Sequence, residues 1–220
     1  MERVCKVLKT YQGKDKMLRC VQYFCRFNRG WMESSAGASI LGQSGEIIKS
    51  KNWSMFKVLM NARRSFRWFQ SIPSILALYR LVKSDCVWGE KNVVLFTLNK
   101  IFMVLFPLID HYRFFILAKW TNRHTQAQVR NVAFGFLCMA QICKSVAMLR
   151  LRSETSDRAK REKYEWDFAK AFLGVVCIAH VSEFPILRHF TNEVLCGLSG
   201  SVHSAMDVYD AWRSTAPPKR

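Results

Sequence analysis

The apolar and polar positions between Trp53 and Lys83 repeat with the period of an amphipathic helix. At about 100° per residue, one face carries the apolar set Met55, Val58, Leu59, Ala62, Phe66, Phe69, Ile72 and Leu76. The opposite face carries the cations Lys57, Arg63, Arg64 and Arg67. Pro73 is expected to interrupt this helix, with Ser71 capping a following segment. The pattern is typical of a helix packed on its own protein core or of one lying in a membrane interface.

Other stretches of the chain also show helical periodicity. They are residues 3–29, 92–118, 125–150, 168–187 and 194–212. Residues 33–45 are rich in glycine and serine and predict a loop or a partly helical linker. Residues 150–167 carry charges of both signs and predict a solvated loop with the start of a helix.

The segment 92–118 is the most hydrophobic part of the chain. Pro107, Asn99, Lys100, Asp110 and Arg113 interrupt it, so it does not predict a clean lipid-facing span. The central apolar run of 125–150 is short for a span. Residues 92–118 fit a core helix of an all-α domain, or a span whose polar residues face a bundle interior.

The predicted fold class is all-α, a membrane-associated helical bundle with amphipathic N-terminal helices and apolar C-terminal helices. We expect residues 1–83 to form a basic amphipathic membrane-binding region. Residues 84–220 should form an apolar helical region with possible transmembrane segments and the charged loop near 150–167.

Charge narrows the class of partner. The chain has 34 lysines and arginines against 16 acidic residues, a formal charge of +18. Residues 1–83 alone hold 16 basic and 4 acidic residues. Such an excess indicates an anionic partner, which is nucleic acid, an anionic lipid surface or an acidic protein. Because half the chain is hydrophobic and no nucleic-acid-binding motif is present, an anionic phospholipid membrane is favoured.

No motif predicts catalysis. None of the eight cysteines forms a CxxC pair, so we expect neither a metal site nor a cofactor. No nucleophile motif or phosphate-binding loop is present. The neighbours Asp110 and His111, and the pair His180 and Glu183, fit ordinary polar pairs better than an active site.

Two other functions remain open at this point. The polar residues Lys100, Asp110, Lys144 and Glu183 lie within apolar runs and fit a membrane pore for small metabolites. A soluble basic helical protein that binds nucleic acid or an acidic partner is the second alternative.

Three segments together resemble the peroxin-11 family. The first is Tyr11-Gln12-Gly13-Lys14-Asp15-Lys16, which is similar to the N-terminal helix of the family. The second, residues 61–67, is similar to its basic and aromatic amphipathic segment. The third joins Gly197-Leu198-Ser199-Gly200 with Tyr209 and Trp212, like the family's glycine-rich C-terminal helix. Size and basicity resemble the kinetoplastid members of glycosome membranes.

The resemblance implies a peroxisomal or glycosomal membrane protein with cytosolic termini that elongates the organelle and promotes its division. It also implies self-association and recruitment of fission machinery, such as a dynamin-related GTPase and its membrane adaptor. Nucleic acid is then not a partner.

The predicted functional residues follow from this interpretation. Arg63, Arg64 and Arg67 should contact lipid headgroups, and Phe66 and Phe69 should form a wedge between lipids. Two further residues complete the lipid-binding set, namely Lys57 and Trp68. Small residues let helices approach closely in a membrane, which predicts helix packing at Gly197 and Gly200.

Overall fold

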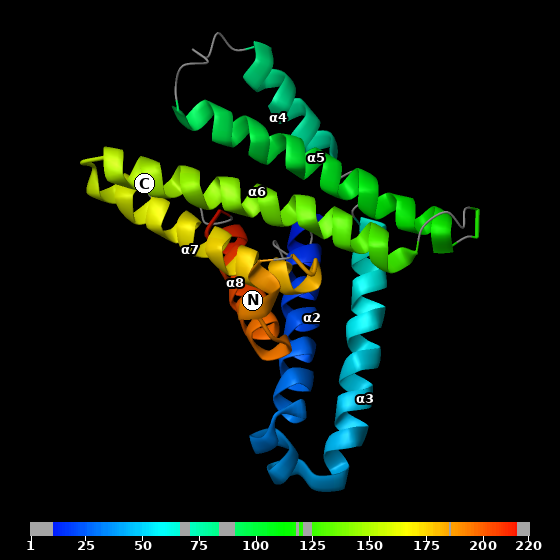
Figure 1. The fold of residues 1–220 in the computed structure, drawn as a ribbon. Helices are drawn as coiled ribbons and strands as arrows, with labels where there is room; N and C mark the ends of the chain where they lie inside the picture. The colour runs from blue at the N-terminus through cyan, green and yellow to red at the C-terminus, as the bar shows by residue number, and fades with distance from the viewer. Residues whose placement is uncertain are drawn as a thin grey trace. The chain divides into compact units, whose positions relative to one another are not determined.

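The described part of the chain is almost entirely helical and divides into two compact units. A computed structural model describes residues 11–66, 71–83, 91–117, 119–120, 125–184 and 186–214. These residues form seven α-helices, numbered α2 to α8, and one short 3-10 helix, η1 (Figure 1). They contain no β-strand, so the predicted all-α class is confirmed.

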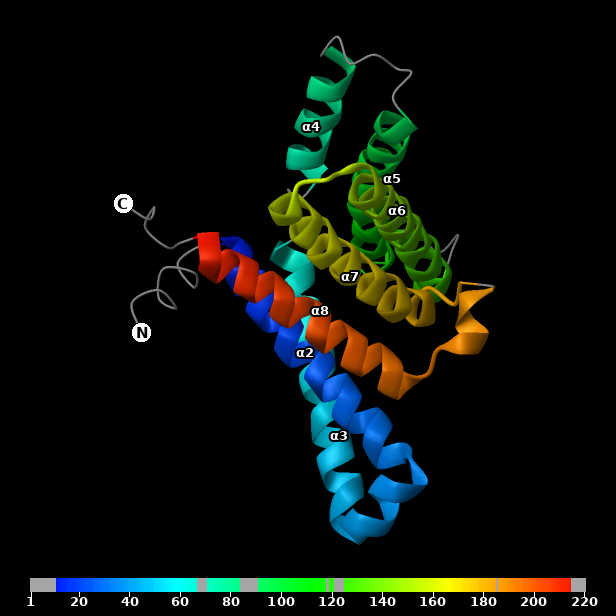
Figure 2. The ribbon, with the colours of Figure 1, turned by 90° about the vertical axis from the view of Figure 1, so that its left-hand side faces the viewer.

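Unit 1 combines the two ends of the chain, residues 1–66 and 191–220. Its described helices are α2 (Tyr11–Glu33), α3 (Ser35–Phe66) and α8 (Glu193–Ser214). α2 packs against both of the others, and Figure 2 shows α8 lying along α2. Both contacts are antiparallel, because Asp15 at the start of α2 meets Arg63 near the end of α3, and Arg26 meets Glu193 at the start of α8.

The turn between α2 and α3 is tighter than the sequence predicts. Ser34 is the one residue between the two helices, so of the two alternatives for 33–45 the loop is wrong, and the stretch is helical on both sides of Ser34. The Ser34 hydroxyl accepts a hydrogen bond from the Gly37 amide at 3.3 Å, which caps α3. A Cβ atom on Gly37 would lie 2.2 Å from the Trp31 carbonyl oxygen. The small residues therefore allow the chain to turn directly from α2 into α3 without a loop.

Unit 2 comprises residues 67–190. Its helices are α4 (Ser71–Lys83), α5 (Lys91–Leu117), α6 (Gln126–Glu154), α7 (Arg158–Val181) and η1 (Leu187–Phe190). α4 packs on α5, α5 on α6, and α6 on α7, so α6 lies between two neighbours (Figure 1). Pro73 lies in the first turn of α4, as predicted, and Ser71, the expected cap, is the first residue of the helix. Thr125 and Gln128 form a capping box at the start of α6, and Asp157 caps α7.

Two helices of unit 2 are long and apolar enough to cross a membrane. They are Asn92–Arg113 within α5 and Gln126–Glu154, which is α6. α5 continues through Pro107, although the sequence predicts a break there. Pro107 is fully buried, and packing on α6 is strong enough to offset the hydrogen bond that a proline removes from a helix.

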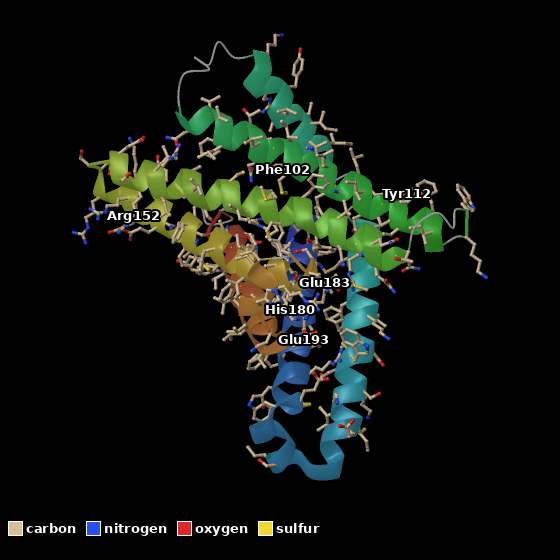
Figure 3. The ribbon with its side chains drawn as sticks, viewed as in Figure 1. Phe102, Tyr112, Arg152, His180, Glu183 and Glu193 are labelled. Atoms are coloured by element: carbon tan, nitrogen blue, oxygen red, sulfur yellow. The ribbon has the colours of Figure 1, made fainter. Side chains whose placement is uncertain are left out.

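Unit 2 contains an apolar core cluster. Cys138 of α6 is buried together with Val175, Ile178 and Ala179 of α7. Between α5 and α6, Phe106 meets Phe134 edge to face, and Phe102 packs against Phe136 with ring centroids 5.9 Å apart (Figure 3). Polar contacts also join these helices: the Asn99 amide donates to the Ala140 carbonyl at 2.7 Å, and the Asn92 amide donates to the Glu154 carboxylate at 3.4 Å.

The compact units do not follow the predicted division into residues 1–83 and 84–220. That division was drawn from composition, whereas the units reflect which helices pack together. α8 is distant from α2 in sequence but packs along it, and α4 packs on α5 despite its basic, amphipathic surroundings. The charged stretch 150–167 is mostly helical, since only residues 155–157 connect α6 to α7.

Candidate membrane-binding surface

The apolar face of α3 points away from its helical neighbour. Val58 is 63% exposed and Met55 50%, and Ala62 is also exposed. Ile47 and Ile48 extend the same face toward the start of the helix. A helix packed on a soluble core buries its apolar stripe, so the orientation of α3 is the reverse of that arrangement.

The polar side of α3 contains the residues that pack inward. Arg63 is only 2% exposed, and its Nε donates to the Asp15 carboxylate of α2 at 2.8 Å. A second donor of the same guanidinium bonds the Gln22 amide oxygen. The sequence predicts that Arg63 binds lipid headgroups. In the structure it instead links α3 to α2 through these two hydrogen bonds. The helical period of the sequence correctly groups the residues that share one side of α3. It does not show which side packs on the neighbouring helix.

Aromatic rings and cations complete the contact between α2 and α3. Phe56 is buried and stacks on Trp53, with ring centroids 4.9 Å apart. The Arg29 guanidinium lies 4.1 Å from the centroid of the Trp53 ring, and the Lys57 ammonium lies 5.5 Å from it. Lys57 itself is exposed, so it remains available to an anionic surface.

α4, in unit 2, also exposes its apolar face. Its exposed apolar residues fall within one face and are Ile72, Ile75, Leu76 and Tyr79. The half-buried residues are smaller on average and lie on the opposite side, namely Ser74, Ala77 and Leu78. Arg80 and Lys83 are exposed in the last turn. α4 therefore presents a bulky apolar face beside cations, which is the composition of an interfacial helix.

Several predicted lipid-binding residues lie outside the described part of the structure. Arg67, Trp68 and Phe69 fall in the segment 67–70, between α3 and α4. Arg64 and Phe66 belong to the last turn of α3, but their side chains are not described. The headgroup and wedge roles of these five residues stay predictions.

The family-like motif at the start of α2 supplies the centre of the unit 1 interior. Asp15 is buried and accepts hydrogen bonds from Arg63 of α3 and from Arg19 of its own helix at 3.3 Å. Arg19 also reaches Asp207 of α8 at 3.2 Å. The Lys16 ammonium donates to the Asp207 carbonyl at 3.4 Å.

The other motif residues have less central positions. Gly13 is buried, Lys14 is exposed, and the side chain of Gln12 is not described. Asp15 is therefore the member of the motif that connects all three helices of unit 1, through Arg63 to α3 and through Arg19 to α8.

α8 packs on α2 through its small residues. A Cβ atom on Gly197 would lie 2.3 Å from the Phe27 backbone nitrogen, and one on Gly30 would lie 2.9 Å from the Val194 nitrogen. Gly200 is buried on α8 as well. Such close backbone approach requires glycine, and it is frequent between helices in membranes.

Charged residues at the junction of α6 and α7 are exposed and mutually paired. Arg152, labelled in Figure 3, donates to Glu165 at 2.7 Å, and Arg158 donates to Glu162 at 3.1 Å. The hydrogen bond from Arg152 lowers the pKa of Glu165 below its ordinary value. This end of the hairpin carries a solvated surface.

Three of the four charged residues on which the pore alternative rests lie close to a residue of opposite charge. Asp110 accepts from Arg113 at 3.0 Å, and Lys144 lies 3.8 Å from Asp167. Lys100 is half-buried on α5. The pore stays a prediction without further support.

Glu183, the fourth of those residues, lies beyond the end of α7. It has a positive φ of 52°, accepts from Arg130 at 3.4 Å and lies 3.6 Å from Arg188. His180 and Glu183, both labelled in Figure 3, therefore do not share a helix face as the sequence spacing suggested.

Ile75 and Tyr79 are candidate membrane-contacting residues that the sequence interpretation did not select. Their spacing from Ile72 and Leu76 fits the same helix face, but the sequence predicts the wedge at Phe66 and Phe69. The sequence does not show that α4 packs on α5 through the side that carries its smaller residues.

These surfaces define an all-helical protein with outward apolar faces, cationic flanks and two helices capable of crossing a membrane. The sequence model of peroxisomal biogenesis factor 11 (PEX11) matches residues 1–171, and the chain belongs to this family. Comparison with curated proteins and with solved structures gives no match. The family is one of peroxisomal biogenesis factors associated with the membrane and is not a family of enzymes.

Proposed function

We propose that this protein remodels the peroxisomal or glycosomal membrane by inserting apolar helix faces into one leaflet. Insertion expands that leaflet relative to the other, and the resulting curvature elongates the organelle and promotes its division. Family membership supports the role in organelle biogenesis. The mechanism is our inference from the exposed faces of α3 and α4.

The outward face of α4 is the observation that carries this proposal. Ile75 and Leu76 are each about half exposed, at 46% and 51%, on a helix with Arg80 and Lys83 in its last turn. In water such a face would be covered by the protein core. At a membrane, the apolar residues would enter the acyl-chain boundary while the cations stay at the headgroups.

The energies are sufficient for reversible binding. Full burial of an aliphatic side chain contributes about 1.5–3 kcal/mol, and each cation near an anionic surface about 1 kcal/mol. Ile75 and Leu76 are already half covered, so each would contribute less than that range. Stable residence then depends on helices that cross the bilayer, and α5 and α6 have the required length.

The remaining partners follow from the same proposal. Cytosolic termini and insertion from the cytosolic side would leave the protein accessible to fission machinery, such as a dynamin-related GTPase and its adaptor. Self-association would concentrate the inserted helices and increase curvature. The exposed apolar faces support lipid contact more directly than they support the nucleic-acid alternative.

The test uses the full-length protein in vesicles that contain anionic phospholipid. Ile75→Glu plus Leu76→Glu should abolish tubulation seen by electron microscopy, because two carboxylates cannot enter the acyl-chain boundary. The matched control is Ser153→Glu plus Ser156→Glu, which adds the same charge at the exposed junction of α6 and α7.

The control should tubulate vesicles like the unmodified chain. Equal tubulation by the α4 variant would contradict the assignment to α4. Loss of tubulation in both variants would show that added negative charge, rather than the apolar face, is responsible.

A further inference from the structure

One end of unit 2 carries exposed aromatic and aliphatic side chains. α5, α6 and α7 alternate in direction, so α5 and α7 end where α6 begins (Figure 1). Glu183, beyond the end of α7, accordingly lies 3.4 Å from Arg130 in the second turn of α6. The exposed residues at this end are Trp120, Ile186 and Phe190, and each is between 71% and 78% exposed. We call the region of these three residues the aromatic end of unit 2.

Trp120 is fixed in place although it is exposed. α5 ends in a Schellman motif, in which the Trp120 amide donates to the Phe115 carbonyl at 2.9 Å. Lys119 holds the left-handed position of the motif with a φ of 58°, where glycine is usual, and Glu183 has a φ of 52° at the matching position after α7. The Trp120 ring also packs on the Phe115 ring, with centroids 5.5 Å apart. The fold therefore holds an exposed indole ring at the end of α5.

The aromatic end carries more cations than carboxylates. Lys119 and Arg188 are exposed and come shortly before Trp120 and Phe190 in the chain. Glu183 is the one acidic residue that the structure describes at this end, and its carboxylate lies 3.6 Å from Arg188. Aromatic rings mixed with cations are typical of the membrane–water boundary, where anionic headgroups attract the cations.

The opposite end of unit 2 has a different surface. Between Ser153 and Lys163, every exposed residue is polar or charged apart from Ala159. On α6, the stretch from Arg130 to Arg150 measures about 30 Å at about 1.5 Å per residue, and the hydrocarbon core of a bilayer is also about 30 Å thick. α6 can therefore cross a bilayer with the aromatic end at one boundary and the charged junction of α6 and α7 in water beyond the other.

We propose that the aromatic end anchors unit 2 at the membrane–water boundary of an anionic bilayer, with Trp120, Ile186 and Phe190 at the level where headgroups meet acyl chains. Lipid fits this surface better than a protein partner does, because the adjoining helices α5 and α6 have the length of spans and the cations match anionic headgroups. The inference goes beyond membrane bending, because the anchor sets the depth of unit 2 whether or not α3 and α4 generate curvature.

Depth-dependent fluorescence quenching in full-length protein tests the proposal. The fluorescent aromatic amino acid acridonylalanine replaces Trp120 or Phe190, in protein reconstituted into vesicles of phosphatidylcholine and phosphatidylglycerol. The vesicles contain lipid with a nitroxide quencher either near the start of an acyl chain or near its end, at the bilayer centre. Arg158, whose side chain is 93% exposed at the start of α7, is the control position. Circular dichroism verifies that each variant keeps the helical content of the parent.

The nitroxide near the start of the acyl chain should cause the larger loss of fluorescence at Trp120 and Phe190, and a smaller loss at Arg158. Quenching no greater than at Arg158 would overturn the proposal, and energy transfer between labelled copies would then identify a second chain as the partner. Stronger quenching from the bilayer centre would overturn it in favour of full insertion. The α4 double variant should keep the quenching, so failure of membrane bending and failure of this inference are separable.

Discussion

Two helix pairs in this protein differ in the residues that they bury. Between α6 and α7 the interior is apolar, around Cys138 and Ile178, and ion pairs such as Arg152 with Glu165 are exposed. Between α2 and α8 the interior holds glycines and the pairs of Arg19 and Arg26, whereas the exposed residues of α8 are apolar.

The difference shows that helix pairs of one chain can pack in two ways. In water, apolar burial stabilises a helix pair and charges remain outside. In lipid, apolar residues gain nothing from burial, so close contact and polar pairing hold the helices together. The α2–α8 pair fits the second way of packing, and the charged end of the α6–α7 hairpin fits the first.

The largest expected effect is at the centre of unit 1. Asp15→Asn leaves Arg19 and Arg63 without their shared carboxylate, which should destabilise unit 1 by about 3–5 kcal/mol. Denaturant unfolding in detergent, followed by circular dichroism, measures the loss. Glu162→Gln removes an exposed pair and should change stability by less than about 0.5 kcal/mol. Equal effects of the two variants would show that the Asp15 network is not a buried tie.

A core truncation should distinguish the two ways of packing. Ile178→Ala removes part of the apolar cluster of unit 2 and should cost about 2–5 kcal/mol. Val58→Ala removes an exposed side chain of α3 and should cost less than about 0.5 kcal/mol in detergent. Thermal unfolding of both variants provides the comparison. A large loss at Val58 would mean that its face is covered by protein.

Two glycines should respond in opposite directions. Gly197→Leu places a side chain against the Phe27 backbone and should cost about 1–3 kcal/mol or more. Gly135→Ala on α6 meets open space and should stabilise the helix by about 0.5–1 kcal/mol. The unfolding midpoints of both variants measure these changes in stability. A Gly197→Leu variant as stable as the parent would exclude the close α2–α8 contact.

The smallest effect concerns the exposed charges of unit 2. Arg152→Ala removes the hydrogen bond that lowers the pKa of Glu165, so this pKa should rise toward its ordinary value. Because the folded pKa is lowered, the pair stabilises the fold above the unfolded pKa and ceases to do so as pH falls through the folded value. NMR titration of the Glu165 carboxyl measures the shift, with Lys163→Ala as a control that should leave it unchanged.

The sequence by itself determined the helical class, the amphipathic period of residues 53–83 and the position of Pro73 in the first turn of α4. Periodicity and proline chemistry are local, so they can be derived without knowing what a helix packs against. The resemblance to the peroxin-11 family also rested on local motifs, and the family match confirms it.

Only the tertiary structure decided which face of each helix is covered. An amphipathic pattern is the same whether its apolar side meets a core or a lipid, so it could not place Arg63 inside unit 1 or leave Val58 outside. The pairing of α2 with α8 depends on contacts between residues far apart in sequence, such as Arg26 with Glu193. Such contacts arise from the packing of whole helices, and no local pattern specifies them.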